Sequence, residues 1–222
     1  MLDTIEGHVE AGGEVAAPAI VRSRLRGIAV LGSHPQTKRL APYHDDGFLI
    51  YACSPDNSPY GFSPDACAPP RVDQFFEIHR PVFDRSRPYE YLDWLRNIPV
   101  VWMRDPVAIR FRAENGEPLF PTARLYPEKE MKARFGAFTF TSSIAFIMAK
   151  AIVDIEKMMD EGRMGGSEPP MLGLWGILQS SKVEYEKQRQ GTQNMIWQAT
   201  QSGIKVLAAQ ESRLFDPPPE DF

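Results

Sequence analysis

The sequence predicts an α/β fold, a three-layer sandwich with a mostly parallel central sheet. Several short segments are apolar at consecutive positions, a pattern typical of strands that are covered on both faces of a sheet. These segments alternate with others in which apolar residues recur every three or four positions, as they do in amphipathic helices. Strands and helices in alternation favour a parallel sheet between two layers of helices.

Length and composition are those of an ordinary globular domain. The chain has 222 residues, of which 43% are hydrophobic and 24% are charged. These values exclude a collagen, a coiled coil and a largely disordered chain. The 25 basic and 29 acidic residues give a net charge of −4, which argues against binding to the phosphate backbone of nucleic acids.

The sequence predicts a cytoplasmic protein that makes no contact with membranes. No apolar run approaches the roughly 20 residues that a membrane-spanning helix needs. Residues 1–6 carry acidic rather than basic side chains, unlike the start of a secretory signal. Cys53 and Cys67 do not form a Cys-x-x-Cys pair, and we expect both to be reduced.

Composition along the chain predicts three regions. Residues 1–26 are expected to form an extended arm, because they have no hydrophobic period and contain the small basic cluster Arg22, Arg24 and Arg26. This arm is either a frayed terminus or a segment that lies on its own domain or on a neighbour. Residues 27–210 form the α/β domain, and residues 211–222 form a Pro-rich tail.

Six apolar segments are predicted to be strands: residues 27–31, 48–53, 72–78, 98–103, 171–177 and 204–208. Pro99 stands near the start of its strand, where a missing N–H group does least harm. Three segments are predicted to be helices: residues 88–97, the segment from Thr141 to a stop at Gly162, and residues 192–202. Pro88 suits the first turn of its helix, and Gly203 closes the last. Residues 104–137 are expected to be irregular, and residues 163–170 and 182–189 to be loops.

Candidate ligand-binding residues follow the predicted strands, because ligands of parallel sheets bind at the carboxyl ends of the strands. The first strand is followed by a glycine turn that suits an anion, and the second by side chains that suit the edge of a base or ribose. The candidates for nucleotide binding in these two turns are Gly32, Ser33, Thr37, Ser54, Asp56 and Asn57. Ordinary turns account for the same residues and stay an alternative.

A second set of candidates lies later in the chain. Thr141, Ser142 and Ser143 precede the long helix, where capping hydroxyls and free N–H groups favour an anion. Arg189 has the geometry to clamp a phosphate or carboxylate. His79 and Glu184 are the candidate catalytic proton acceptors. Simple helix capping and a solvated charged face are the alternatives for this set.

The residue patterns of several other sites are missing. The four histidines, His8, His34, His44 and His79, are scattered, and none forms an HxxxH pair, so no metal is expected. There is no Gly-x-Ser-x-Gly elbow and no complete dinucleotide fingerprint. We therefore predict no resident cofactor, and neither a serine hydrolase nor a dehydrogenase.

Taken together, the segments IAVLGSHPQT, LIYACSPDN, FFEIH, TFTSSIAFIMAKAI, LGLWGI and EYEKQRQG resemble a group of Rossmann-like proteins of tailed bacteriophages, over about residues 27–208. More distantly, the order of motifs is similar to that of sialyltransferases that use a CMP-sugar donor, and to the pterin pyrophosphokinase-like family. The resemblance implies a nucleotide-contacting turn at Gly32, Ser33 and Pro35, and a hydroxyl-rich helix opening at Thr141. It also implies a protein of the bacterial host's cytoplasm or of the virion.

The sequence departs from the family pattern at several positions. His34 and Gln36 replace the second glycine and the serine of the family's Gly-x-Gly-Pro-Ser turn, and Ser54 replaces an asparagine. Leu178 stands where an aspartate is usual, and no histidine follows His79. These departures weaken the expectation of transferase activity more than that of nucleotide binding.

Two functional hypotheses follow. In the first, the protein binds a nucleotide or nucleotide-sugar at the carboxyl ends of its strands, and any reaction is transfer of a group such as a glycosyl from that nucleotide. In the second, it is a non-catalytic structural or interaction protein of a phage particle, and its arm and tail contact neighbouring copies, other particle proteins or a host factor.

Overall fold

The fold is a single seven-stranded sheet in which every paired strand is parallel to its neighbour. A computed structural model describes residues 24–53, 69–78, 89–177, 183–209, 212, 214 and 215. Within them the strands are β1 (Gly27–Leu31), β2 (Phe48–Ala52), β3 (Gln74–Glu77), β4 (Val101–Met103), β5 (Ala123–Leu125), β6 (Met171–Trp175) and β7 (Lys205–Ala208). The helices are α1 (Pro35–Lys38), α3 (Tyr89–Arg96), α4 (Pro106–Arg110), α5 (Glu128–Phe135), η1 (Ala137–Thr139), α6 (Ser143–Asp160) and α7 (Val183–Gln201). The predicted α/β class is confirmed.

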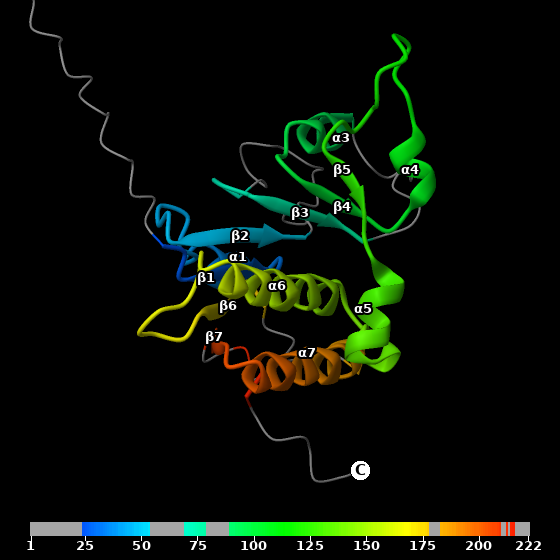
Figure 1. Ribbon diagram of the computed structural model, residues 1–222. Helices are drawn as coiled ribbons and strands as arrows, with labels where there is room; N and C mark the ends of the chain where they lie inside the picture. The colour runs from blue at the N-terminus through cyan, green and yellow to red at the C-terminus, as the bar shows by residue number, and fades with distance from the viewer. Residues whose placement is uncertain are drawn as a thin grey trace, which may run out of the picture.

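Helices cover both faces of the sheet, as Figure 1 shows with α3 on one side and α6 and α7 on the other. The fold has two hydrophobic cores, and successive residues of β1 pack alternately in one and the other. Ile28 and Val30 pack with α6, whereas Ala29 and Leu31 pack in the core that includes α3. All five residues of β1 are buried, which is why the sequence of this strand is apolar without alternation.

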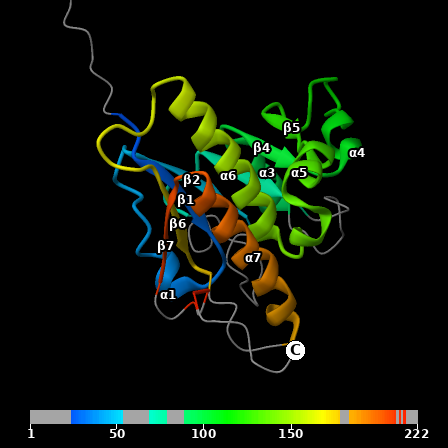
Figure 2. The ribbon, with the colours of Figure 1, turned by 60° about the horizontal axis from the view of Figure 1, so that its bottom comes forward.

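The strand order is β5-β4-β3-β2-β1-β6-β7. The chain therefore builds the sheet outward from β1 to β5, returns across it, and adds β6 and β7 on the other side of β1. The return is made through α6, which crosses the sheet obliquely with α7 beside it (Figure 2). A sheet of this kind has its topological switch point between β1 and β6.

A chain of partly buried hydrogen bonds ties α6 to three strands. The indole N–H of Trp102 in β4 donates to Oε1 of Gln74 in β3 at 2.6 Å. Nε2 of Gln74 donates to the Tyr51 hydroxyl in β2 at 2.8 Å, and that hydroxyl donates to Asp154 in α6 at 2.7 Å. Lys150 forms an ion pair with Asp154 and lies over the Trp102 ring, so the last residue of the network is linked back to the first. Each polar group needs a specific partner, so the network favours one register of the strands under one position of the helix.

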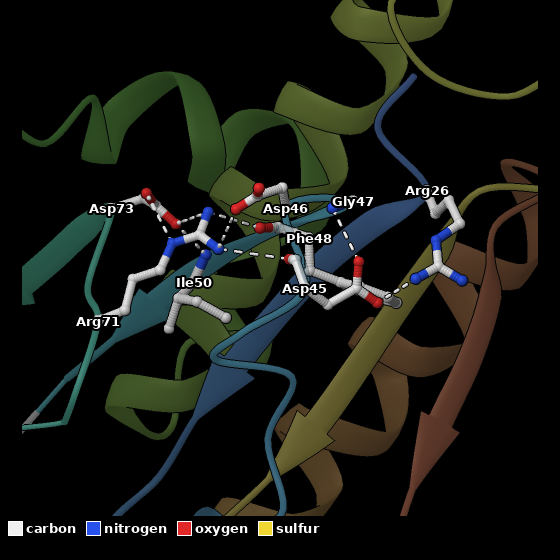
Figure 3. Close-up of polar contacts among 8 residues, drawn as sticks. All are labelled: Arg26, Asp45, Asp46, Gly47, Phe48, Ile50, Arg71 and Asp73. Carbon is white, nitrogen blue, oxygen red and sulfur yellow. Dashed lines mark hydrogen bonds and ion pairs between the residues drawn. The ribbon is translucent and has the colours of Figure 1, made fainter. Parts of the chain in front are cut away.

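Charged side chains organise the amino ends of β1 and β2 (Figure 3). Nη2 of Arg71 donates to the carbonyl of Phe48 at 2.9 Å and pairs with Asp73 at 3.0 Å. Asp73 in turn accepts from the backbone N–H of Ile50 at 2.7 Å. These side chains supply hydrogen bonds to the start of β2, where the backbone ladder with β3 has not yet begun.

The prediction that residues 104–137 are irregular is wrong, because they hold α4, β5, α5 and η1. Strand β5 is short and lies at the edge of the sheet, so its burial pattern is not that of an apolar core strand. The predicted loop at residues 182–189 is wrong in the same way, because α7 begins at Val183. Its first half is polar, which concealed the helical period, and only the apolar second half was recognised.

Described residues of the predicted arm and of the predicted tail contact the α/β domain. In the predicted arm, Leu25 N–H donates to the Arg163 carbonyl at 3.2 Å, and Arg26 N–H donates to the Gly47 carbonyl at 2.7 Å. Within the predicted tail, Ser212 and Leu214 are buried, and Gln193 of α7 donates to the Leu214 carbonyl. Residues 1–23 and 216–222 lie outside the described part of the chain.

We predict that Tyr51→Phe lowers the free energy of unfolding by about 1–3 kcal/mol, because it removes a hydrogen-bond partner from the partly buried side chains of Gln74 and Asp154. Urea denaturation measures the effect. Tyr43→Phe is the matched control, because Tyr43 is also buried and its hydroxyl donates to a backbone carbonyl, that of Lys38. A smaller loss for Tyr51→Phe than for the control would contradict a stabilising role for the network.

Candidate functional site

The carboxyl edge of the sheet contains two groups of polar residues. The first follows β1 and β6, on either side of the switch point. The second follows β3, β4 and β5 and extends to the start of α6. The predicted site residues that the structure describes divide between these two groups and the adjoining face of α7.

At the switch point, the chain segments after β1 and β6 stay in contact beyond the ends of the strands. The N–H of Gly32 donates to Trp175 at 2.8 Å, and the N–H of His34 donates to Gly176 at 2.9 Å. A Cβ atom on Gly32 would lie 2.4 Å from the carbonyl oxygen of Gly176. Glycine at position 32 is therefore required by the approach of the two backbones, whether or not a ligand is bound.

Thr37 takes part in the same contact. Its side chain is buried, and its hydroxyl oxygen accepts a hydrogen bond from the N–H of Gly176 at 3.0 Å. The predicted role of Thr37 in holding phosphate is therefore not needed to explain the residue. Its structural role is to fasten α1 to the end of β6.

Ser33 and His34 differ from their neighbours, because they offer polar groups that the fold does not use. Ser33 is exposed, and His34 is partly buried. Nδ1 of His34 is shielded from solvent and has no hydrogen-bond partner in the described part of the chain. Buried polar atoms are usually paired, so this nitrogen is suited to contact with a ligand or an ordered water. Sequence reasoning treated His34 as a departure from a family motif and did not select it.

The second group is centred on an ion pair at the ends of β4 and β5. Nε and Nη2 of Arg104 each donate to a different carboxylate oxygen of Glu128 at 2.8 Å. Lys132, one turn further along α5, donates to Glu128 at 2.6 Å. The hydrogen bond from Arg104 is the main reason that the pKa of Glu128 falls to about 2, with help from Lys132 and against the effect of partial burial. Glu128 is thus firmly ionised at neutral pH.

A pocket of about 470 Å³ opens beside this ion pair. Its lining combines apolar side chains with charged ones and consists of Arg104, Pro106, Leu125, Tyr126, Pro127, Glu128, Lys129 and Glu130. Lys129 and Glu130 are exposed, whereas Tyr126 is buried. The pocket therefore has an apolar wall and a charged rim, a combination common in sites for small molecules.

The start of α6 is joined to this pocket. The Tyr126 hydroxyl donates to the carbonyl of Phe146 at 2.8 Å, and burial raises the pKa of Tyr126 well above its ordinary value. The guanidinium of Arg104 lies 4.5 Å from the centre of the Phe146 ring. Phe146 is in the first turn of α6, so the positive end of the helix dipole is close to the pocket.

Thr141, Ser142 and Ser143 lie at this end of α6, as predicted from the sequence. The Ser142 hydroxyl caps the helix by accepting from the N–H of Ala145 at 3.3 Å, and Ser143 is the first helical residue. Thr141 is exposed and donates to the Gln188 carbonyl of α7 at 3.4 Å. This contact brings Thr141 next to the turn of α7 that carries Arg189, which is partly buried.

A buried carboxylate completes the edge at β3. Glu77 is the last residue of that strand, is almost fully buried and accepts a hydrogen bond from the Tyr91 hydroxyl of α3. The N–H of Arg104 donates to the Glu77 carbonyl at 3.4 Å, so Glu77 adjoins the Arg104–Glu128 pair through the backbone.

Several predicted site residues are not placed by the structure. Ser54, Asp56, Asn57 and His79 lie outside the described residues. The backbone of Glu184 belongs to α7, but the position of its side chain is not described. The proposed roles of these five residues stay predictions.

Arg104, Tyr126, Glu128 and Lys132 were missed because the sequence of residues 104–137 shows no strong period. A usable signal was present for one of them. Arg104 directly follows a predicted strand, in the same position relative to β4 as Gly32 has relative to β1. Glu128 and Lys132 have the spacing of a helical i, i+4 ion pair, so their pairing can be predicted once α5 is recognised as a helix.

Comparisons with known proteins found no match, so the class of the protein is assigned from its fold alone. No protein-family model, no curated protein and no solved structure matches the chain. The parallel sheet and its switch point define a Rossmann-like α/β protein. The described helices include none that is long and apolar enough to span a membrane. Among the residues described, no group of three or more His, Cys, Asp or Glu side chains is arranged to hold a metal ion.

We predict that Gly32→Ala lowers the free energy of unfolding by about 1–3 kcal/mol, because the added methyl group meets the Gly176 backbone rather than a movable side chain. Chemical denaturation measures the change, and Ser33→Ala is the adjacent control, since Ser33 is exposed. Equal stability of the two variants would show that the backbones after β1 and β6 are not in tight contact.

The low pKa of Glu128 predicts a pH-dependent contribution to stability. The carboxylate is stabilised in the folded protein, so its contribution is complete above the unfolded pKa of about 4.3 and disappears as the pH falls toward 2. We expect Glu128→Gln to cost roughly 2 kcal/mol at pH 7 and much less at pH 2.5. Urea denaturation of both proteins across this range measures the difference. A difference that does not change with pH would contradict the ion pair.

Proposed function

We propose that the protein binds a nucleotide or nucleotide-sugar at the carboxyl edge of its sheet. The single observation that carries this proposal is the unpaired, solvent-shielded Nδ1 of His34, which stands beside exposed Ser33 at the switch point. Sheets of this class bind their ligands at the carboxyl ends of the strands, beside the topological switch point.

The two polar groups of the edge suit the two ends of such a ligand. Three strand spacings separate β1 from β4, a distance of about 14 Å. The phosphates are proposed to lie near Ser33 and His34, where hydroxyl and imidazole groups offer hydrogen bonds. The sugar or base is proposed to occupy the pocket of about 470 Å³ beside Arg104, which has an apolar wall for stacking or packing.

Charges of both signs surround the pocket at the carboxyl edge. The pocket lies close to the first turn of α6, an 18-residue helix, and is rimmed by Lys129. The same helix end is flanked by Thr141, Ser142 and Arg189. These residues, predicted to bind an anion, therefore adjoin the pocket. Glu128 and Glu130 oppose this charge, which favours binding of the uncharged part of the ligand, rather than its phosphates, in the pocket itself.

Group transfer from the bound nucleotide is a further part of the proposal that rests on the sequence alone. Its candidate proton acceptors are His79 and Glu184, and their side chains are not described. We therefore assign no catalytic step. The bacteriophage origin and the alternative role as a non-catalytic particle or host-factor-binding protein also stay predictions from the resemblance.

Isothermal titration calorimetry with CMP, a UDP-sugar, NAD and ATP tests the proposal. At least one is expected to bind saturably, and at 100 times its Kd to stabilise the protein by about 2.7 kcal/mol. His34→Ala is expected to weaken that binding about three- to tenfold, the loss that one hydrogen bond predicts.

The matched control is His44→Ala, because His44 is exposed and lies before β2 at the amino edge of the sheet. It should bind the nucleotide as tightly as the unaltered protein does. No binding of any of the four ligands, or equal affinities of the two histidine variants, would contradict the proposed site.

A further inference from the structure

A second pocket, of about 260 Å³, lies at the amino edge of the sheet, opposite the proposed nucleotide site. It forms between residues 24–26 and the loop that connects α6 to β6. This loop is hydrogen bonded to residues 24–26 at both of its ends. Leu25 N–H donates to Arg163 at 3.2 Å, and Met171 N–H donates to Arg26 at 2.9 Å. Between these contacts, residues 165–170 form an arch over the pocket.

The arch offers backbone donors that the fold does not use. In the described part of the chain, the N–H groups of Gly165, Gly166 and Ser167 make no hydrogen bonds. Gly165 and Gly166 have φ values of 85° and 137°, which side chains rarely allow, so these glycines shape the arch. Glycine-rich turns with free N–H groups commonly hold anions.

The Arg24 guanidinium adds the positive charge. Its described polar contact is a long hydrogen bond of 3.4 Å to the Met164 carbonyl. Nη1 of Arg24 lies 3.2 Å from the position that a Cβ atom on Gly166 would occupy, so the guanidinium lies against the glycine turn. Arg24 is exposed and lines the pocket.

The other charges of the pocket determine how strongly it attracts an anion. Arg26 is already paired with Asp45, as Figure 3 shows, so it adds little net charge. Glu168 lines the pocket and makes no ion pair among the described residues, so its carboxylate opposes an anion. Arg24 is therefore the charge that attracts an anion, and Glu168 is the charge that weakens its binding.

We propose that this pocket binds an oxyanion, the phosphate group of a small phosphorylated compound, between Arg24 and the N–H groups of Gly165, Gly166 and Ser167. A guanidinium donates paired hydrogen bonds that match phosphate geometry, and the glycine turn leaves room for the oxygens. The pocket is independent of the proposed nucleotide site, because the two lie at opposite ends of the same strands.

The test is a titration of the full chain with inorganic phosphate, followed by the amide signals of Gly165, Gly166 and Ser167 in ¹⁵N NMR spectra. Saturable shifts of these three signals are expected, and sodium chloride at the same ionic strength should not reproduce them. The result that would overturn the proposal is signals that do not move, or that move equally with chloride.

Two variants of opposite sign sharpen the test. Arg24→Gln is expected to weaken phosphate binding at least tenfold, whereas Glu168→Gln is expected to strengthen it several-fold. Arg96→Gln and Glu114→Gln make the same changes of net charge at distant positions and should leave the affinity unchanged.

Equal effects of the pocket variants and their controls would mean that phosphate responds only to net charge, and would overturn the proposal. Thermal melting verifies that each variant is folded, which is expected because all four side chains are at least partly exposed. His34→Ala should bind phosphate here as the unaltered protein does, so failure at one edge is distinguishable from failure at the other.

Discussion

The contact between the chain segments that follow β1 and β6 is the constraint on which the arrangement of the molecule depends. Gly32 and Gly176 approach so closely that neither position has room for a side chain. The N–H groups of Gly32 and His34 continue the hydrogen bonding of the strands into these segments. Because β1 lies at the centre of the sheet and is buried along its whole length, a disturbance here affects both cores. The same contact fixes the position of His34.

The two edges of the sheet are built differently, and this difference separates structural from functional polar groups. At the amino edge, Arg71 and Asp73 donate to or accept from the backbone of β2, so their charges are used by the fold. At the carboxyl edge, Ser33 is exposed, Nδ1 of His34 has no hydrogen-bond partner among the described residues, and an open pocket lies beside Arg104. The pocket under the arch at residues 165–170 is the exception at the amino edge.

The central elements of the fold could be predicted from the sequence, because a strand that is buried on both faces consists of consecutive apolar residues. Strands β1, β2 and β6 and helix α6 were recognised from consecutive or periodic apolar residues. The region from α4 to η1 was missed because its elements are short and lie at the sheet edge, where one face meets solvent and apolar residues are few.

The candidate site was predicted less completely, and the reason is physical. Topology alone predicted a site at the carboxyl edge, and it drew attention to the turn after β1. Sequence could not distinguish Thr37, whose hydroxyl serves the fold, from His34, whose Nδ1 does not, because the two differ only in contacts made with a distant strand. The Arg104–Glu128 pair joins residues 24 positions apart and needed the strand order for its recognition.

A crystal structure of the protein with a nucleotide-sugar soaked at saturating concentration is the most direct test of the proposed site. Density for the phosphates is expected within hydrogen-bonding distance of Ser33 and His34, with the remainder of the ligand directed toward the pocket beside Arg104. An ordered nucleotide bound only at another face of the molecule, or an empty carboxyl edge at saturation, would contradict the proposed site.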